Sequence, residues 1–489
     1  MQELTLVQVF EQIEEAFKAN DLRRVEALLW PAVEQFPDIA QFWFYGGCVF
    51  FQTGRSAVAA QLFRKAIELE DGPHIYSNLG ACLRRMNLHE EGILVLSQAL
   101  DRDPNYAPAL VNLGSMFVNE GCPNRGIPFL EKALKIGTER GAGWNLALLY
   151  LEAGRFGEGF DLYRQGIARE RMIRKFSRIE GHEPELLPNS GDFKDKTLLV
   201  WGEQGIGDEL MFGTMLERAR EDFAEVILEG HPRLTAIHEA AHPGMRIFST
   251  RKEEVPAWYD DGGFRVDYKC GIGDLGAFYR REPEDFVRGR MFNRKPPYAR
   301  EASETTLRYR ESLLELSGGK PVIGLATRGG VMQTARQYRT LKIEDVAPFF
   351  EKTDALFVAL DYDDMTGFAT HVADKYGADR YRWFPSIVQH YDYVNVAELL
   401  AALDLTVTVC QSVAHLAGGM GAPVRVLTPQ RCAWRYTPAP GFSPETWYWY
   451  PETQVKLYRQ TDPDSWAVPI QRAVEDIQRL QSGGPLDLA

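Results

Sequence analysis

The feature that most constrains this chain is a short pattern that returns every 33 or 34 residues through its first third. Asn78, Asn112 and Asn145 occupy equivalent places in the stretches YSNLGACL, LVNLGSMF and GWNLALLY, and WFYGGCVF fits one period earlier. Each stretch is followed by a turn and then by a second helical apolar pattern. A unit of this length cannot bury its apolar face alone, so the period predicts a stack of helix pairs.

This helix–turn–helix period resembles the tetratricopeptide repeat. The resemblance covers roughly residues 5–170 in about five units, of which the first is degenerate. It implies a superhelix whose concave face binds a peptide or protein. In tetratricopeptide-fused O-GlcNAc transferases an asparagine ladder holds the acceptor polypeptide, which implies acceptor-binding roles for Asn78, Asn112 and Asn145. A side-chain amide can donate to and accept from a peptide backbone. The alternative is that asparagine is simply common at this repeat position.

Composition excludes several classes of protein. The chain has 68 acidic and 55 basic residues, a formal charge of −13, which argues against a nucleic-acid binder. It has no run of about 18 apolar residues, so we expect no integral membrane segment. Its start lacks a signal-peptide pattern, and its six cysteines are scattered without metal-ligand spacing. We therefore expect a cytoplasmic protein without a metal site.

The second half alternates strand-like and helical stretches, which is typical of a doubly wound parallel α/β fold. A polar stretch around 290–319 divides the strands into two sets, so we expect two Rossmann-like lobes with ligands beyond the carboxyl ends of their strands. The expected strands are 197–201, 224–228, 245–248, 322–326, 356–360, 405–409 and 424–427. The expected helices include 208–220, 343–351, 395–403 and 412–420. The expected domains are the repeats (1–170), a linker (171–195), an N-terminal lobe (196–315) and a C-terminal lobe with a final helix (316–489).

A glycine-rich turn, WGEQGIGDELMF at 201–212, follows the first of these strands. Such turns usually cradle phosphate, but Asp208 stands at the helix start, where it would repel one. The dinucleotide pattern GxGxxG is also incomplete, because position 210 is leucine. A plain structural reading makes Asp208 a helix N-cap.

Two segments without acidic residues favour an anion site in the C-terminal lobe instead. Residues 405–444 contain no Asp or Glu, although the average of 68 in 489 would place about five or six there, and 318–342 is also free of them. Ser412 is a candidate N-cap of a helix whose backbone N–H groups could receive a diphosphate. The alternative is a buried helix whose neighbours need no acids. The basic residues of the two segments are Arg425, Arg431, Arg435, Lys320, Arg328, Arg336, Arg339 and Lys342.

The stretches LLVWGEQGIGDELMF and VNVAELLAALDLTVTVCQSVAHLAGGMGAPVRVLTP together resemble the GT-B glycosyltransferases of the lipopolysaccharide heptosyltransferase group (glycosyltransferase family 9-like). In bacteria such domains are often fused behind tetratricopeptide repeats. The resemblance covers roughly residues 190–480 in layout. It implies that Asp208 is the general base that deprotonates an acceptor hydroxyl. It also implies that Gln204, Gly205 and Gly207 face the acceptor.

The resemblance further implies a nucleoside-diphosphate sugar as co-substrate, with no cofactor and no metal, and direct displacement with inversion. The family reads Asp-Thr-Ser/Gly-x-x-His where this chain has CQSVAH at 410–415. His415 is kept and would stabilise the leaving group, unless it is a packed helix histidine. The missing Asp-Thr puts the donor contacts in doubt. The implied donor-binding residues are Gln411, Ser412, Val413, Ala414, Arg328, Arg339 and Asp361, with Asp363 competing for the last role.

Aromatic residues and one cysteine of the C-terminal lobe have alternative interpretations. The aromatic run 447–450 could stack on a base or sugar, but we favour a core role, and residues 434–436 could wall the sugar site. Cys410 has no paired base in view, so we do not expect a nucleophile.

The expected function is a glycosyltransferase that acts on a protein held by the repeats. One alternative is a degenerate, non-enzymatic scaffold, which the Cys410-Gln411 replacement favours. Another is an enzyme for a lipid-linked or polysaccharide acceptor that the repeats merely recruit.

Overall fold

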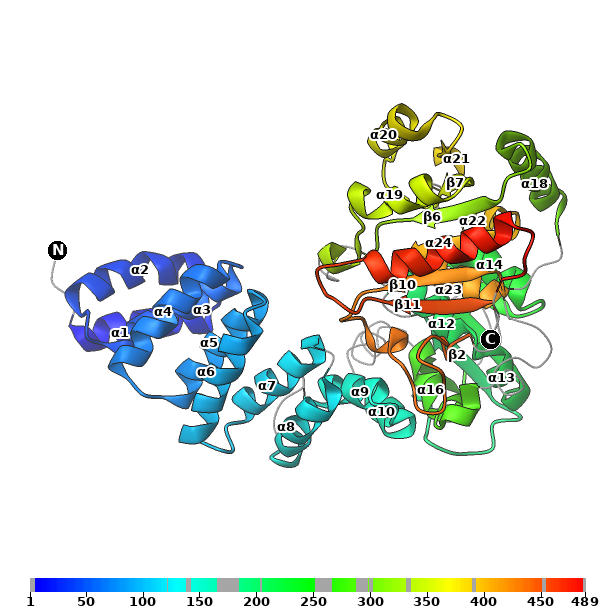
Figure 1. Cartoon of the computed structure of the whole chain (residues 1–489). Coiled ribbons are helices and arrows are strands. Elements are labelled where there is room, and N and C mark those ends of the chain that lie inside the picture. Colours follow the sequence, from blue (N-terminus) through cyan, green and yellow to red (C-terminus); the bar gives the residue numbers. More distant parts are fainter. Residues whose placement is uncertain are drawn as a thin grey trace. The chain divides into compact units, whose positions relative to one another are not determined.

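The computed structural model describes residues 5–120, 122–137, 142–164, 184–202, 205–250, 266–286, 298, 302–330, 336–388, 393–450 and 454–486. The chain forms two compact units, Met1–Leu149 and Tyr150–Ala489, and passes from one to the other within a single helix. Figure 1 shows helices alone in the first unit and two parallel sheets with their helices in the second.

The first unit consists of consecutive antiparallel helix pairs, as the repeat period predicts. α9 crosses into the second unit, where α10 completes the fifth pair. The helices are α1 (Leu6–Lys18), α2 (Leu22–Gln35), α3 (Ala40–Gln52), α4 (Ser56–Leu69), α5 (Pro73–Arg85), α6 (His89–Arg102), α7 (Ala107–Glu120), α8 (Pro123–Lys135), α9 (Ala142–Glu152) and α10 (Phe156–Tyr163).

The repeated residues explain the repeated geometry. The turn between paired helices uses a left-handed residue, which Asn20, Gly54, Asn87 and Gly154 supply with φ between 56° and 82°. Within each pair a small residue lets the helices approach. A Cβ on Gly80 would lie 2.5 Å from the Leu96 side chain, so only glycine fits there.

The second unit contains a five-stranded sheet, ordered β1-β5-β2-β3-β4, and a six-stranded sheet, ordered β11-β10-β9-β6-β7-β8. All the pairings between these strands are parallel. The strands are β1 (Glu185–Leu186), β2 (Thr197–Trp201), β3 (Glu225–Glu229), β4 (Arg246–Phe248), β5 (Tyr268–Gly271), β6 (Val322–Ala326), β7 (Leu356–Ala359), β8 (Tyr381–Arg382), β9 (Leu405–Val409), β10 (Val424–Thr428) and β11 (Val455–Arg459).

Helices connect these strands and cover the sheets. The α-helices are α12 (Ile206–Gly213), α13 (Leu216–Asp222), α14 (Thr235–Ala241), α16 (Gly276–Tyr279), α18 (Glu304–Ser317), α19 (Ile343–Lys352), α20 (Thr366–Tyr376), α21 (Pro385–Val388), α22 (Val394–Ala401), α23 (Ser412–Met420) and α24 (Ala467–Gln481). The 3₁₀ turns are η1 (Pro232–Leu234), η2 (Ile272–Leu275), η3 (Pro283–Phe286), η5 (Arg336–Arg339) and η6 (Trp434–Tyr436).

The structure confirms the seven expected strands to within a residue or two at their ends, and it adds β1, β5, β8 and β11. The two longer additions carry polar residues inside the sheet, such as Lys269 in β5 and Lys456 in β11, so their apolar runs are interrupted. The single helix expected over 208–220 is wrong, because the chain breaks at Thr214 into α12 and α13. The stretch expected to be a polar divider contains α18, and the expected linker contains β1.

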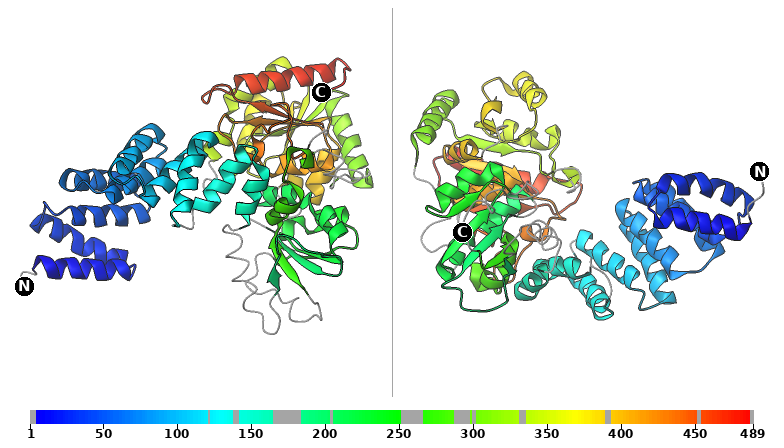
Figure 2. Two further views of the ribbon diagram at one scale, coloured as in Figure 1. Left: turned by 90° about the horizontal axis from the view of Figure 1, so that it is seen from below. Right: turned by 180° about the vertical axis from the view of Figure 1, so that it is seen from behind.

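α23 and α12 bring the two sheets together. Figure 2 shows α24 over one face of the six-stranded sheet and α23 under the other, where it faces α12. Tyr298 lies between these helices: its hydroxyl donates to the Leu210 carbonyl at 2.8 Å, and its backbone N–H donates to the Gly419 carbonyl at 3.0 Å. A Cβ on Gly207 would lie 3.5 Å from the Ser412 Cα and 3.0 Å from the His415 ring, so the starts of the two helices are in contact and a larger residue would crowd the histidine.

Candidate functional site

Each sheet has one place where its strand order reverses. In the five-stranded sheet β2 lies between β5 and β3, and in the six-stranded sheet β6 lies between β9 and β7. The loops after such neighbouring strands diverge and leave a crevice, which is where open α/β sheets bind ligands. The glycine-rich turn follows β2, and the CQSVAH stretch follows β9. The two candidate stretches therefore stand at the two switch points.

The two segments without acids meet at the second switch point. A Cβ on Gly329 would lie 2.7 Å from the Cys410 carbonyl oxygen, so the loop after β6 lies directly against the loop after β9. Arg339 donates from Nη1 to the same carbonyl at 3.3 Å. The predicted donor-side residue Arg339 thus stands beside the start of α23.

The first turn of α23 carries the predicted donor-binding run from Gln411 to Ala414. Gln411, not Ser412, is the N-cap, and its side chain makes no capping bond. The Gln411 amide is 7% exposed and donates to Thr408 Oγ1 at 3.3 Å, while its Oε1 has no partner among the described residues. The Ser412 hydroxyl shares a hydrogen bond of 2.7 Å with the Tyr393 hydroxyl. Val413 and Ala414 are buried and contribute only backbone to the site.

His415 is enclosed by tyrosines. Its Nε2 shares a hydrogen bond of 2.8 Å with the Tyr436 hydroxyl, and its Nδ1 shares one of 3.2 Å with the Tyr450 hydroxyl. The ring is 2% exposed. Burial, and then the charge of Arg435, lower the pKa of His415 well below its usual value. The imidazole is therefore neutral, and it fixes the two hydroxyls beside the start of α23. The predicted leaving-group role remains a prediction.

Asp208 is the third residue of α12, whose N-cap is Gly205, so the plain N-cap interpretation of Asp208 is wrong. Its carboxylate forms an ion pair with Arg435 on η6, 227 positions away in the chain. The two side chains are 17% and 20% exposed. The predicted base and the predicted anion-binding lobe are therefore joined by one charged contact, which the sequence does not reveal.

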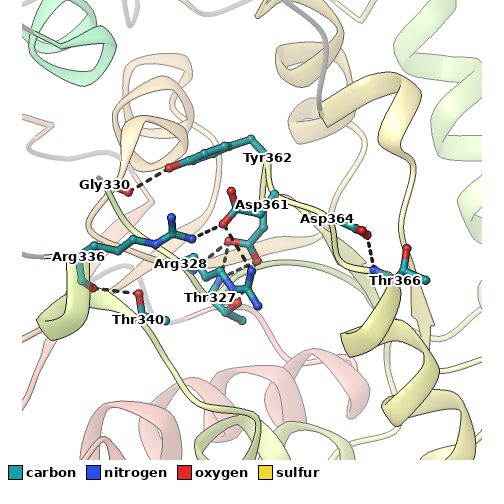
Figure 3. Close-up of polar contacts among 10 residues, drawn as sticks. Thr327, Arg328, Gly330, Arg336, Thr340, Asp361, Tyr362, Asp364 and Thr366 are labelled. Carbon is teal, nitrogen blue, oxygen red and sulfur yellow. Dashed lines mark hydrogen bonds and ion pairs between the residues drawn. The ribbon is translucent and has the colours of Figure 1, made fainter. Parts of the chain in front are cut away.

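Asp361 is used within the fold. Figure 3 shows it pointing back to the loop after β6, where it accepts hydrogen bonds from the backbone N–H groups of Thr327 and Arg328 and from the Thr327 hydroxyl. It is 1% exposed, and burial raises its pKa to about 6 against the opposing effect of these bonds. In this arrangement its carboxylate shapes the β6 loop, and the ribose-binding role stays a prediction. Asp363 instead pairs with Arg328 and Arg336.

The acceptor-side residues are only partly described. Gln204 lies outside the described residues, whereas Gly205 caps α12 and Gly207 lies against α23, with a would-be Cβ 3.0 Å from His415. Sequence reasoning missed the neighbouring Glu209. This fully buried carboxylate accepts the backbone N–H of His231 at 2.8 Å and fixes the β3 loop to α12.

The asparagines of the repeats use their amide donors internally. Asn112 donates to Ser77 Oγ at 3.1 Å, and Asn145 donates to Ser115 Oγ at 2.5 Å, so each ties its helix to the preceding repeat. Asn78 donates to the carbonyl of His74 in its own helix. None of the three Oδ1 atoms has a hydrogen-bond partner among the described residues. This row of asparagines therefore offers a peptide three acceptors for backbone N–H groups, together with the second N–H of Asn78 and of Asn145.

Several other expectations have clear outcomes. Arg425 does not belong to an anion site: it is fully buried and bonds Asp476 at 2.5 Å. The aromatic run 447–450 is core, at most 1% exposed, as favoured. Cys410 is 1% exposed and burial raises the pKa of its thiol, which does not suit a nucleophile.

The described residues hold no group of three or more His, Cys, Asp and Glu side chains placed to bind a metal ion. In the same part of the chain, no helix combines the length and apolar character needed to cross a membrane.

Comparisons with known proteins support the repeats. The family model described as tetratricopeptide repeat matches residues 10–74. Protein FlbA of Caulobacter vibrioides is 25% identical over 489 aligned positions, which span 90% of this chain and 78% of that protein.

Solved structures that align with this chain include MamA, with 17% identity and a TM-score of 0.30, covering 36% of this chain and 98% of MamA. The pilF protein of Pseudomonas aeruginosa aligns with 19% identity and a TM-score of 0.31, covering 35% of this chain and 81% of pilF. The family match and the helix pairs together identify the N-terminal part of the chain as a tetratricopeptide-repeat domain.

Proposed function

We propose that the α/β half is a metal-independent glycosyltransferase and that the repeats hold its protein acceptor. The observation that carries the proposal is the meeting of two switch points. α12 leaves the β2 switch point with Asp208, α23 leaves the β9 switch point with Gln411, and the two helices lie against each other at Gly207. A carboxylate base and an anion-binding helix start are what displacement of a nucleoside diphosphate requires.

The roles follow from the surroundings. The backbone N–H groups at the start of α23 and the nearby Arg339 receive the diphosphate, and the unpartnered Gln411 Oε1 accepts a hydrogen bond from a hydroxyl of the donor sugar. Asp208 accepts the proton of the acceptor hydroxyl. His415 positions the hydroxyls of Tyr436 and Tyr450. The proposal takes this pairing of lobes to be the GT-B arrangement that the sequence resemblance implies.

The test starts from ligand binding by the full-length protein. Thermal unfolding is followed with a panel of nucleoside diphosphates, for the wild type, Gln411→Ala and the control Gln471→Ala on α24. A ligand at a hundred times its Kd stabilises the folded state by about 2.7 kcal/mol. We expect one nucleoside diphosphate to raise the Tm of the wild type and of the control, with the shift reduced in Gln411→Ala. A well-folded wild type that responds to none of the panel contradicts the proposal.

A second candidate function is a protein-binding scaffold with a transferase-like α/β half. The observation that favours it is the pairing of Asp208 with Arg435, which occupies the expected base. This candidate predicts no nucleotide response and protein binding through the repeats alone. The ligand panel therefore separates the two candidates.

A further inference from the structure

Arg435 occupies an unusual place. It lies on η6, in the loop after β10, and its guanidinium reaches the loop after β2 of the other sheet to pair with Asp208. Its neighbour Tyr436 bonds His415 in the first turn of α23. The charge of Arg435 also acts on Cys410 and His415, on both sides of the Gln411 N-cap. One cation thus stands between the candidate base and the candidate donor site.

Two buried polar atoms near this ion pair lack partners in the described part of the chain: a donor of Arg435 and an acceptor of Gln411. Arg435 Nε is buried and has no hydrogen-bond acceptor among the described residues, and Gln411 Oε1 is buried without a partner as well. The segment 405–444 supplies no acid of its own. Burial acts to lower the pKa of Arg435, and Asp208 is the carboxylate whose charge raises it, with a net shift upward. A second anion brought to this place would meet a cation with a free donor.

We propose, on the basis of the proposed function, that Arg435 exchanges partners during the reaction. In the empty protein it neutralises Asp208 and occupies the carboxylate. When a donor diphosphate binds at the start of α23, its larger negative charge draws the guanidinium away, and Asp208 becomes free to accept the acceptor's proton. Arg435 is then a phosphate ligand and also a device that enforces order, because the base is available only after the donor has bound.

The exchange predicts that removing the candidate base increases the affinity for diphosphate. If Asp208 and the diphosphate compete for Arg435, removing the carboxylate strengthens diphosphate binding. If the ion pair is only a static link between the two sheets, removing it leaves binding unchanged or weakens it by loosening the site. The direction of change in one variant therefore separates exchange from a fixed contact.

The experiment is isothermal titration calorimetry on the full-length protein with inorganic pyrophosphate and with the nucleoside diphosphate that gives the largest thermal shift. The variants are Asp208→Asn, Arg435→Ala and the double variant, with Asp374→Asn on the exposed face of α20 as a control for lost charge. We expect Asp208→Asn to lower Kd by roughly tenfold, the order of coupling seen for close charge pairs. Arg435→Ala should raise Kd at least as much.

The double variant completes the test. Under exchange it binds like Arg435→Ala, because without the cation there is nothing to compete for. A tighter Kd in the double variant than in Arg435→Ala would mean that Asp208 acts by general repulsion, and it would overturn the exchange. An unchanged or higher Kd in Asp208→Asn would overturn it too.

Failure of the proposed function gives a different result from failure of the exchange. If the proposed function is wrong, the folded wild type, Asp208→Asn and the Asp374→Asn control bind neither pyrophosphate nor any nucleoside diphosphate. The exchange is then contradicted together with the donor site. Arg435→Lys gives a last check on folding, since it keeps the charge and should have a lower Kd than Arg435→Ala.

Discussion

The repeats and the α/β half are stabilised over different distances along the chain. In the repeats, Gly80 receives Leu96 from the next helix and Asn112 bonds Ser77 of the preceding repeat. In the α/β half, Arg425 pairs with Asp476 and Asp208 with Arg435, 51 and 227 positions apart. Local, repeated contacts make a solenoid that depends on nearest neighbours. Single, distant polar pairs make the α/β half depend on a few residues.

The largest expected effect comes from breaking such a distant pair. Asp476→Asn removes the negative charge that Asp476 places against the buried Arg425 guanidinium and weakens the acceptor of the Tyr458 hydroxyl. Removing one member of a buried pair costs about 3–5 kcal/mol. We expect the apparent free energy of unfolding of the α/β half, followed by urea titration and tryptophan fluorescence, to fall by that amount.

The neighbouring Glu475→Gln is the control for this change. Glu475 is exposed on α24, where it accepts a hydrogen bond from Gln471, so the effect of its substitution should stay within about 0.5 kcal/mol. A loss below 1 kcal/mol in Asp476→Asn would show that the pair does not govern the stability of this half.

The next effect depends on pH and lies where the repeats end. Burial raises the pKa of Glu152 to about 8. Since this is above the value of about 4.3 in an unfolded chain, the folded state binds the extra proton. The contribution of Glu152 to the free energy of unfolding is fully present below about pH 4 and is lost as the pH rises through 8. Glu152→Gln should therefore have a higher Tm than the wild type at pH 9, by several degrees, and nearly the same Tm at pH 5.

Glu158, on the next helix, is a control because its pKa is shifted in the opposite direction. Its hydrogen bond to Arg155 lowers its pKa, so its contribution is present above its unfolded value and is lost as the pH falls. Glu158→Gln should not raise the Tm at pH 9. An equal gain in both glutamine variants would refute the burial argument for Glu152.

A smaller effect probes the local packing of the repeats. Gly114 lies against Leu130, closer than a methyl group allows, whereas no described atom lies within 4 Å of a Cβ built on Gly143. Gly114→Ala should lower the apparent free energy of unfolding of the repeats by about 1–3 kcal/mol through overpacking. Gly143→Ala should raise it by about 0.5–1 kcal/mol through helix propensity. Helical circular dichroism during urea unfolding measures both, and equal effects would contradict the packing role of Gly114.

The same contrast explains what sequence reasoning could reach. The repeats were predictable because each contact recurs at a fixed spacing, so Gly80 and Asn112 are seen several times over. The strands β2, β6 and β9 were predictable because they are continuous apolar runs. β5 and β11 were not, because Lys269 and Lys456 interrupt their apolar pattern. The pairing of Asp208 with Arg435 has no local signal at all, since each residue is ordinary in its own segment.

Asp361 and Arg425 show a second limit. Both stand after or within strands of the six-stranded sheet, where the sequence predicts ligand contacts, and both form hydrogen bonds within the fold. A sequence shows that a charged residue follows a strand, but it does not show whether backbone N–H groups or a buried partner already satisfy the charge. The two segments without acids do lie against each other at the start of α23, so composition predicted a contact that no single residue revealed, and the anion site there stays a prediction.

The smallest expected effect tests what the asparagine row does for the repeats themselves. Asn112→Ala removes the amide that donates to Ser77 Oγ and carbonyl, so it breaks a link between two repeats. A hydrogen bond of this kind contributes about 0.5–1.5 kcal/mol. Asn78→Ala removes a bond within one helix, to the His74 carbonyl, and should cost less. The two variants have the same composition, so urea unfolding followed by helical circular dichroism compares the contacts directly. If Asn78→Ala proves as costly as Asn112→Ala, the row does not act by tying neighbouring repeats together.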